Sequence, residues 1–444
     1  MDRDLLKGSI APQLAALSLP LLLGNVLQQL YNGVDAFILG RWAGDEAFAA
    51  VGIAGSVMNL FIFVLGGICA GISVLFAQLH GAGDQKGYRR EMFLSLTFGG
   101  GFTLGLMILC LLAKHPVLRL IQTPAELLPL VSDYLSVIIG GFLATYLYNL
   151  CAAALRSVGR TGAALLFLAL SMGGNALLDL LFVAVWQKGV AGAAWATVLS
   201  QAFSALASGI YLLRTVPAAR FHRSDMVLDK ALLRDTARLG LVSAMHQSSL
   251  YIGKLLVQGA VNTMGTAGIG AYTAATRIEG FINSFSDSGA EAISVFVAQN
   301  TGAGQKARAR QGLSCGMKLM ILLCLAAALG MAVFAPQLIG VFLTESGEAL
   351  EEGTSYLRLV AVFYVCNFIG AAFVGFFRGT GRVQLPVIGT TVHISVRVLL
   401  SYLLVGKLGL SAVALATGIG WIVVSSLHTF FYHRIRQKES AETC

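Results

Sequence analysis

Two polar residues interrupt an apolar stretch that is long enough to cross a lipid bilayer. The stretch runs from Leu165 to Val185 and contains Asn175 and Asp179. About 20 apolar residues span the hydrocarbon core as one helix, and side chains four positions apart project from the same helix face. Because an ionisable group at this depth is costly, it is by default a candidate functional group. Asp179 is therefore a candidate ligand for a proton or a cation.

Three further polar residues are expected at a similar depth in neighbouring apolar stretches. From a helical rise of about 1.5 Å per residue, Asp35 lies roughly 8 Å, Asp179 about 10 Å and Thr197 about 12 Å inside the outer end of its own stretch. Tyr134 begins another stretch on the same side. The first half of the chain therefore places several polar groups in one layer of the membrane.

These polar groups are suited to a small coupling ion. Carboxylate, amide and hydroxyl oxygens are hard ligands that suit Na⁺, whereas two neighbouring carboxyl groups can hold one proton between them. Two buried acids without a matched base are expensive unless they are neutralised. Internal hydrogen bonding is the alternative role, above all for the uncharged members. We predict a site for H⁺ or Na⁺, with no organic cofactor, formed by Asp35, Tyr134, Asn175, Asp179 and Thr197.

The composition identifies the elements that must position these residues. Of 444 residues, 56% are hydrophobic and only 12% are charged, about half the charged fraction of a soluble domain. We expect an all-α, multi-pass membrane protein. Its twelve predicted spans are 14–40, 46–76, 91–113, 128–155, 161–186, 189–213, 237–263, 268–299, 313–335, 353–377, 384–406 and 408–432.

The basic residues are unevenly distributed between the two ends of these spans. The net charge is +9, and if both termini lie on one side, that side holds 21 Lys and Arg against six on the other. The positive-inside rule then places both termini in the cytoplasm, in a protein of the inner (plasma) membrane. Nucleic acid is not expected as a partner, because no soluble basic domain is present to bind it.

The second half of the chain repeats the first. AQLHGAGDQK at 77–86 returns as AQNTGAGQK at 298–306, and LRSVGR at 155–160 returns as FRGTGR at 377–382. An even number of spans per copy predicts two parallel, pseudo-symmetric six-helix bundles, an arrangement typical of some secondary transporters. We predict an N-terminal lobe over 1–213, a cytoplasmic linker over 214–236, and a C-terminal lobe with a short cytoplasmic tail over 237–444.

The second half does not repeat the predicted ion site. Arg397 stands at the place of Asn175, and Ser401 at that of Asp179. Other polar groups of this half would line a cleft between the bundles, where their acids attract cationic solutes. The candidate substrate-cleft residues are His246, Glu279, Asp287, Glu291, His393 and Arg397.

Structural roles are the alternative for several of these residues. Glu279 and Lys254 lie at similar predicted depth on adjacent spans, so they could form a neutral pair. His246 and His393 could be satisfied packing residues instead of pH switches.

Taken together, the motifs resemble those of the multidrug and toxic compound extrusion (MATE) transporters over essentially the whole chain. They comprise the proline-bearing first span ending in DAFILG at 35–40, the Gln-x-x-Gly-Ala-Gly turn in both halves, LRSVGR and FRGTGR, Asn175-x-x-x-Asp179, and GAAWAT at 192–197. The resemblance implies twelve helices in two lobes, and export of amphipathic, often cationic, compounds in exchange for inward H⁺ or Na⁺. It also implies an N-lobe cation site at Asp35, Asn175, Asp179 and Thr197, with Tyr134 nearby.

The expected mechanism is antiport by alternating access, in which loading of the two acids changes the packing of the first span near Pro20. The expected partners are small-molecule drugs or organic cations and membrane lipid, and the expected state is a monomer. A lipid-linked oligosaccharide flippase of the same superfamily is the alternative within transport. A membrane-embedded enzyme is disfavoured, because the chain has no nucleophile–base pair and no HExxH motif. The chain also lacks a GxxxxGK loop, so ATP is not its expected energy source.

Overall fold

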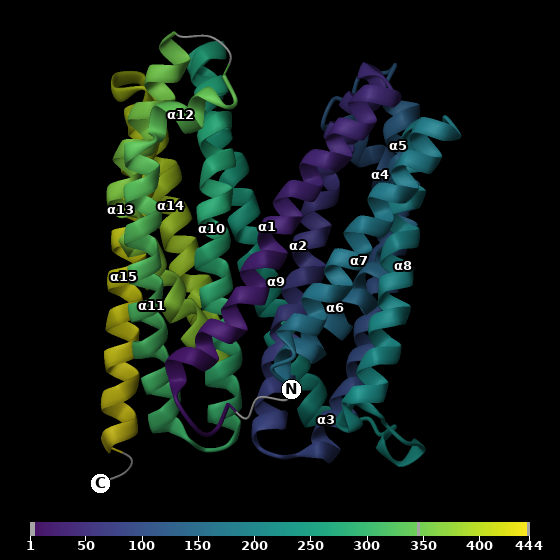
Figure 1. Ribbon diagram of the computed structural model, residues 1–444, viewed down its shortest axis with the longest axis vertical. Coiled ribbons are helices and arrows are strands. Elements are labelled where there is room, and N and C mark those ends of the chain that lie inside the picture. The colour runs from purple at the N-terminus through teal and green to yellow at the C-terminus, as the bar shows by residue number, and fades with distance from the viewer. Residues whose placement is uncertain (1–4, 344–346, 442–444) are drawn as a thin grey trace. The chain divides into compact units, whose positions relative to one another are not determined.

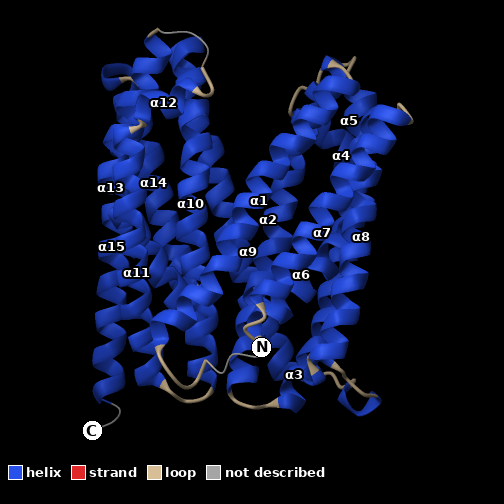
Figure 2. Ribbon diagram, viewed as in Figure 1, coloured by secondary structure: helices blue, strands red, loops and turns tan. Residues whose placement is uncertain are grey.

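The computed structural model describes residues 5–343 and 347–441, and these residues form helices without strands (Figure 2). Figure 1 follows the chain from α1 to α15. The α-helices are α1 (Ile10–Trp42), α2 (Asp45–Gly81), α3 (Gln85–Leu94), α4 (Gly100–Leu120), α5 (Leu128–Gly140), α6 (Phe142–Ser157), α7 (Thr161–Asp179), α8 (Gly189–Thr215), α9 (Lys230–Val261), α10 (Gly265–Gly302), α11 (Lys306–Val333), α12 (Ala335–Gly340), α13 (Glu348–Gly379), α14 (Gln384–Leu408) and α15 (Leu410–Ala441).

Five shorter helical turns join or extend these helices. The turns η1 (Ser95–Gly99) and η2 (Leu180–Val185) are π-helical and continue α3 and α7 without a break. The other three are 3₁₀ turns, namely η3 (Pro217–Ala219), η4 (Arg223–Asp225) and η5 (Asn262–Met264). Helix α1 continues past Pro20.

Most of these helices are long and apolar enough to cross a membrane. Within the described ranges nine candidates meet this description, and α5 with α6, bent by 45°, makes a tenth. Helices α9 and α10 are equally long, but charged side chains interrupt their apolar sequence: Lys254, Arg277, Glu279, Asp287 and Glu291. Together with α9 and α10, the described residues contain twelve helical segments long enough to cross a membrane, which is the predicted number, and the all-α membrane fold is confirmed.

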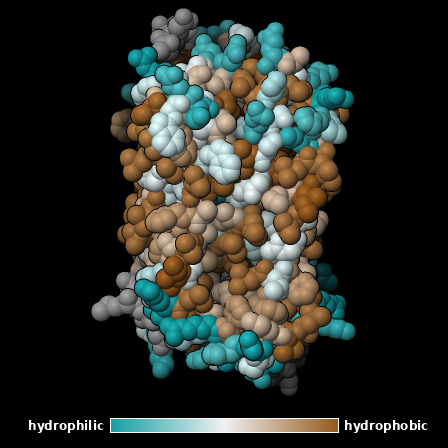
Figure 3. Space-filling view, turned by 90° about the vertical axis from the view of Figure 1, so that its right-hand side faces the viewer, coloured by the Kyte–Doolittle hydropathy of each residue, from teal (hydrophilic) through white to brown (hydrophobic). Residues whose placement is uncertain are grey.

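The surface supports the same conclusion. On the face shown in Figure 3, hydrophobic side chains cover the middle, and hydrophilic ones gather toward both ends. Large apolar side chains are highly exposed, among them Leu112 at 75% and Leu177 at 70%. Exposed apolar area of this extent is expected where lipid, not water, covers the protein.

The repeated sequence motifs form equivalent turns in the two halves. Gly83 and Gly304 both have positive φ angles, of 70° and 74°, which favour glycine because it has no Cβ. Each glycine follows a long helix, and the next N–H closes the turn onto the helix, from Asp84 to Leu79 O at 3.0 Å and from Gln305 to Asn300 O at 2.8 Å. The GAG sequence is therefore a helix C-terminal signal in both copies.

The described residues divide into two compact units, each with its own core. The first comprises 23–244, where α6 and α7 pack on α8, and α2 packs on α6. The second comprises 5–22 and 245–441, where α13 packs on α10 and α15, and α14 packs on α15. Leu14 and Leu17, in the first part of α1, belong to the core of the second unit. The boundaries drawn from the sequence, 1–213, 214–236 and 237–444, stay a prediction.

Candidate functional site

The first unit brings the predicted ion-site residues together from four helices. Asp35 lies on α1, and Asp179 is the last residue of α7; their carboxyl groups are hydrogen-bonded to each other. Asn175, one turn before Asp179, donates from Nδ2 to Thr197 Oγ1 on α8 at 3.3 Å. Tyr134 on α5 lies close enough to act electrostatically on both acids. The layer inferred from helix depth is therefore a contiguous cluster.

This cluster is largely shielded from solvent. Asp179 is 1% exposed, Asn175 is 2% exposed and Tyr134 is 4% exposed, whereas Asp35 and Thr197 are half-buried. Uncompensated burial of two carboxylates would be very unfavourable. Burial thus makes neutralisation of the pair a requirement of this arrangement.

Tyr31 is a member of this cluster that sequence reasoning did not include. Its side chain is hydrogen-bonded to Thr197 and lies close to both acids. The hydroxyl of Thr197 donates to Ala193 O at 3.1 Å, so its single hydrogen is used and its oxygen accepts from the neighbours. The spacing between Tyr31 and Asp35 could have identified Tyr31 from the sequence, because it stands one helical turn before Asp35 on the same face of α1.

The chemistry of the acid pair follows from donor and acceptor counting. An ionised carboxylate only accepts hydrogen bonds. A hydrogen bond between Asp35 and Asp179 therefore requires a proton on one of them. The groups that act on the pair are acids and tyrosines, with no base among them in the described part of the chain. The site can hold a proton, and its oxygens are also of the type that bind a small cation.

In the second unit, Glu279 and Arg397 belong to one buried network. Glu279 is 7% exposed, and its carboxylate accepts from the hydroxyls of Tyr356 at 3.3 Å and Tyr364 at 3.2 Å. Arg397 Nη2 donates to the hydroxyl of Tyr272 at 3.3 Å and is the principal charged neighbour of Glu279. The hydrogen-bond partners of Glu279 are therefore tyrosines, and Lys254 acts on it less than Arg397 does.

The remaining candidates of the second unit do not join this network as one cluster. Glu291 forms an ion pair with Arg378, with Nη2 and Oε2 separated by 3.1 Å. Asp287 is exposed, and Arg378 and Lys254 act on it electrostatically. Arg378 was not among the candidate residues, because the sequence shows it only as part of the FRGTGR motif at 377–382.

The two candidate histidines, His246 and His393, have different neighbours. His393 stacks on the Trp421 ring, with centroids 6.4 Å apart and an interplanar angle of 20°, and Arg397 lies nearby. His246 lies in the field of Arg378 and His428. His428, on α15, is 1% exposed and packs edge-on against Phe377, with ring centroids 5.5 Å apart. The sequence did not predict this burial, because it shows only a single histidine in an apolar run.

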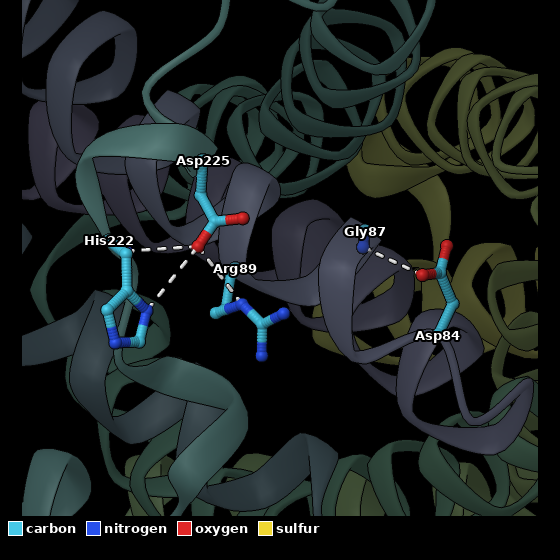
Figure 4. Close-up of polar contacts among 5 residues, drawn as sticks. All are labelled: Asp84, Gly87, Arg89, His222 and Asp225. Atoms are coloured by element: carbon cyan, nitrogen blue, oxygen red, sulfur yellow. Dashed lines mark hydrogen bonds and ion pairs between the residues drawn. The ribbon is translucent and has the colours of Figure 1, made fainter.

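A separate polar cluster fixes the segment between α8 and α9 to α3. Figure 4 shows Asp225 between His222 and Arg89, and Asp84 beside Gly87. The Asp225 carboxylate accepts from the His222 backbone N–H at 3.0 Å and from Arg89 Nε at 3.1 Å. These contacts, the backbone one foremost, lower the pKa of Asp225 below its ordinary value of 3.8. Asp84 caps α3 by accepting from Gly87 N–H at 2.8 Å.

Comparison with known proteins identifies the family of this chain. The MatE family matches residues 20–181 and 243–403. The probable multidrug resistance protein YpnP of Bacillus subtilis (strain 168) is 28% identical over 97% of this chain and 96% of its own length. A solved MATE structure in the bent conformation is similar, with a TM-score of 0.92 and 26% identity over 99% of this chain and 98% of its own.

A second solved structure gives the same result. An outward-facing multidrug resistance MATE family transporter of the MOP superfamily has a TM-score of 0.88 and 26% identity, over 97% of both chains. The family match covers both halves of the chain, including the helices that carry Asp35 and Asp179. The resemblance inferred from the motifs is thus confirmed: the chain belongs to the MatE family of multi-pass membrane transporters, and it is not an enzyme.

Proposed function

We propose that this protein exports small amphipathic molecules from the cell by antiport with H⁺, through the acid pair of its first unit. The hydrogen bond between Asp35 and Asp179 carries the proposal, because two carboxyl groups in contact must hold a proton. The names of the relatives, among them multidrug resistance protein YpnP, support the substrate class. The protein lies in the plasma membrane as a monomer, with both termini in the cytoplasm.

The proposed coupling uses the charge of the pair. With one proton bound, α1 and α7 are held together by a hydrogen bond between their acids. Loss of that proton leaves two neighbouring carboxylates that repel each other. The ion shifts the transporter between its states only by its difference in affinity for them, and a contact that exists only in the protonated pair supplies that difference. Movement of α1 near Pro20 then opens the exit for the substrate.

Na⁺ is the alternative coupling ion. Two carboxylates, the amide oxygen of Asn175 and the hydroxyl of Thr197 would offer it hard ligands. Efflux of a fluorescent organic cation from vesicles, driven by a pH gradient or a Na⁺ gradient applied one at a time, separates the two ions. We expect the pH gradient alone to drive efflux in the wild type and not in Asp35→Asn.

The matched control is Asp133→Asn, the same substitution at an exposed acid one residue before Tyr134. This variant is expected to transport at the wild-type rate. Efflux driven only by Na⁺ would refute proton coupling. Equal, undiminished efflux in Asp35→Asn would remove Asp35 from the site.

The substrates are proposed to be organic cations, recognised in part by the second unit. Glu291 is paired with Arg378, and Glu279 is held by tyrosines near Arg397. The exposed acid Asp287 is therefore the group best placed to attract a cationic solute. Asp287→Asn should weaken binding of a cationic dye more than that of a neutral dye of similar size. Equal losses for both dyes would contradict this role.

A further inference from the structure

Glu91 is a buried acid of the first unit that the proposed coupling site does not use. It lies on α3, six residues after Gln85, and its side chain is fully buried. Its Oε1 accepts from Ser95 Oγ at 2.8 Å, and its Oε2 lies 2.7 Å from Thr236 Oγ1 on α9. A carboxyl group removed from water in this way must be neutralised or fully hydrogen-bonded.

The charges around Glu91 do not neutralise it. The titratable groups that act on it are Asp235 on α9, Tyr88 on its own helix and Tyr146 on α6. Asp235 is an acid, and a tyrosine carries no positive charge. Within the described residues, no lysine, arginine or histidine is among these groups. An ionised Glu91 would therefore be a buried charge without a counter-charge.

The hydrogen bonds around Glu91 are also complete when its carboxyl group carries a proton. Thr236 Oγ1 lies within hydrogen-bond distance of two oxygens, Glu91 Oε2 at 2.7 Å and Leu232 O at 2.8 Å. A hydroxyl has one hydrogen, so it cannot serve both oxygens as acceptors. If Glu91 is protonated, Oε2–H donates to Thr236, and Thr236 donates to Leu232. Every atom of this chain of contacts is then satisfied.

The backbone beside Glu91 is specialised in the same way as that beside Asp179. Ser95 opens the π-helical turn η1, and the hydroxyl of Tyr146 donates to Ser95 O at 2.6 Å. Gly99 makes room for that hydroxyl, since a Cβ there would lie 1.9 Å from it. Asp179 immediately precedes the other π-helical turn, η2. Such turns inside α-helices are frequent at functional sites; Glu91 lies four residues before η1, and Asp179 lies directly before η2.

We propose that Glu91 is a second proton-binding group of the first unit, protonated while Thr236 lies against it, and that it exchanges this proton with the cytoplasm during transport. This inference rests on the proposed proton antiport and on the proposed orientation. In that orientation Glu91 lies about 9 Å from the cytoplasmic start of α3. The step breaks the Oε2–H bond and transfers H⁺ to cytoplasmic water, leaving the carboxylate to accept from Ser95 and Thr236.

The Glu91→Gln variant distinguishes a role of Glu91 in proton exchange from a purely structural role. The glutamine amide can donate to Thr236, and its carbonyl can accept from Ser95, so all hydrogen bonds of the protonated acid are kept. A purely structural role predicts wild-type transport for this variant. The proposal predicts correct insertion and a loss of pH-driven efflux by about tenfold or more. Glu126→Gln, at an exposed acid, is the control expected to transport normally.

Infrared spectroscopy tests the protonated state directly. In a protein with Asp35→Asn and Asp179→Asn, the carbonyl band of a buried protonated carboxyl group should remain, and adding Glu91→Gln should remove part of it. Wild-type efflux in Glu91→Gln, an unchanged band or failure of this variant to insert would each overturn the proposal. If efflux persisted in the Asp35→Asn protein while Glu91→Gln remained defective, the proposed coupling site would be wrong and the Glu91 assignment would stand.

Discussion

Because Asp35 and Asp179 are hydrogen-bonded to each other, we predict that they act as a single site. Asparagine keeps the size of aspartate and can still hydrogen-bond across the pair, so each variant should fold. Each variant nevertheless loses one of the two carboxyl groups, and with it the proton that the pair would share. If proton binding contributes to transport as other positioned acids do, each single variant loses about 100-fold in pH-driven efflux, which corresponds to about 2.7 kcal/mol.

A double-mutant cycle measures whether the two losses combine. Independent acids would multiply their effects to about 10⁴-fold in the double variant. Acids that share one proton titrate as a coupled pair, so the double variant should lose only about 100-fold, close to either single one. The assay is efflux of a fluorescent cation from vesicles containing equal amounts of inserted protein. Losses in efflux that multiply would refute the model in which Asp35 and Asp179 form a single site in the first unit.

Three further predictions test the architecture around the site. Gly375→Ala should destabilise the second unit by about 1–3 kcal/mol, seen as a lower Tm. The reason is that the Cβ of the new alanine would lie 2.3 Å from Ala290 O. An unchanged Tm would contradict the close packing of α10 and α13. Asp225→Asn should make residues 216–229 easier to cleave by a protease at pH 7. The difference in cleavage rate from wild type should shrink below pH 3.8, because a carboxyl group with a lowered pKa stabilises the fold only while it is ionised. A difference in cleavage rate that does not change with pH would refute this. Arg397→Met should destabilise the second unit by about 3–5 kcal/mol, because it leaves the Glu279 charge uncompensated. Adding Glu279→Gln to this variant should restore part of the loss in Tm. Equal Tm values for the single and the double variant would show that the two charges are not coupled.

The sequence predicted the depth of polar groups better than their partners. Helical rise alone placed Asp35 and Asp179 in one layer, and the structure brings them into contact. The same reasoning offered Lys254 as a partner of Glu279, yet the contacting groups are Tyr356 and Tyr364. Depth along the membrane normal follows from residue counting, but the rotation of each helix about its own axis depends on packing that a single sequence does not reveal.

Glu91 was missed for a related reason. It stands in the polar sequence RREM near the start of a predicted span, where a charged residue is normally solvated. Its burial depends on the segment that follows α8, which docks on α3 through Asp225 and carries Thr236 toward it. Contacts between residues 145 positions apart in the chain have no local signature, so only the folded arrangement identifies this acid.

The duplicated halves keep their turns and differ in their buried charges. The GAG turns have the same geometry in both copies, so the repeat preserves the lengths and ends of the helices. Where the first copy has Asn175, the second has Arg397, whose guanidinium stays charged at any physiological pH. Its network with Glu279 contains a fixed cation, whereas the groups that act on the acid pair of the first copy, within the described residues, include no cation. This difference supports the proposal that ion exchange belongs to the first half and contacts with the substrate to the second.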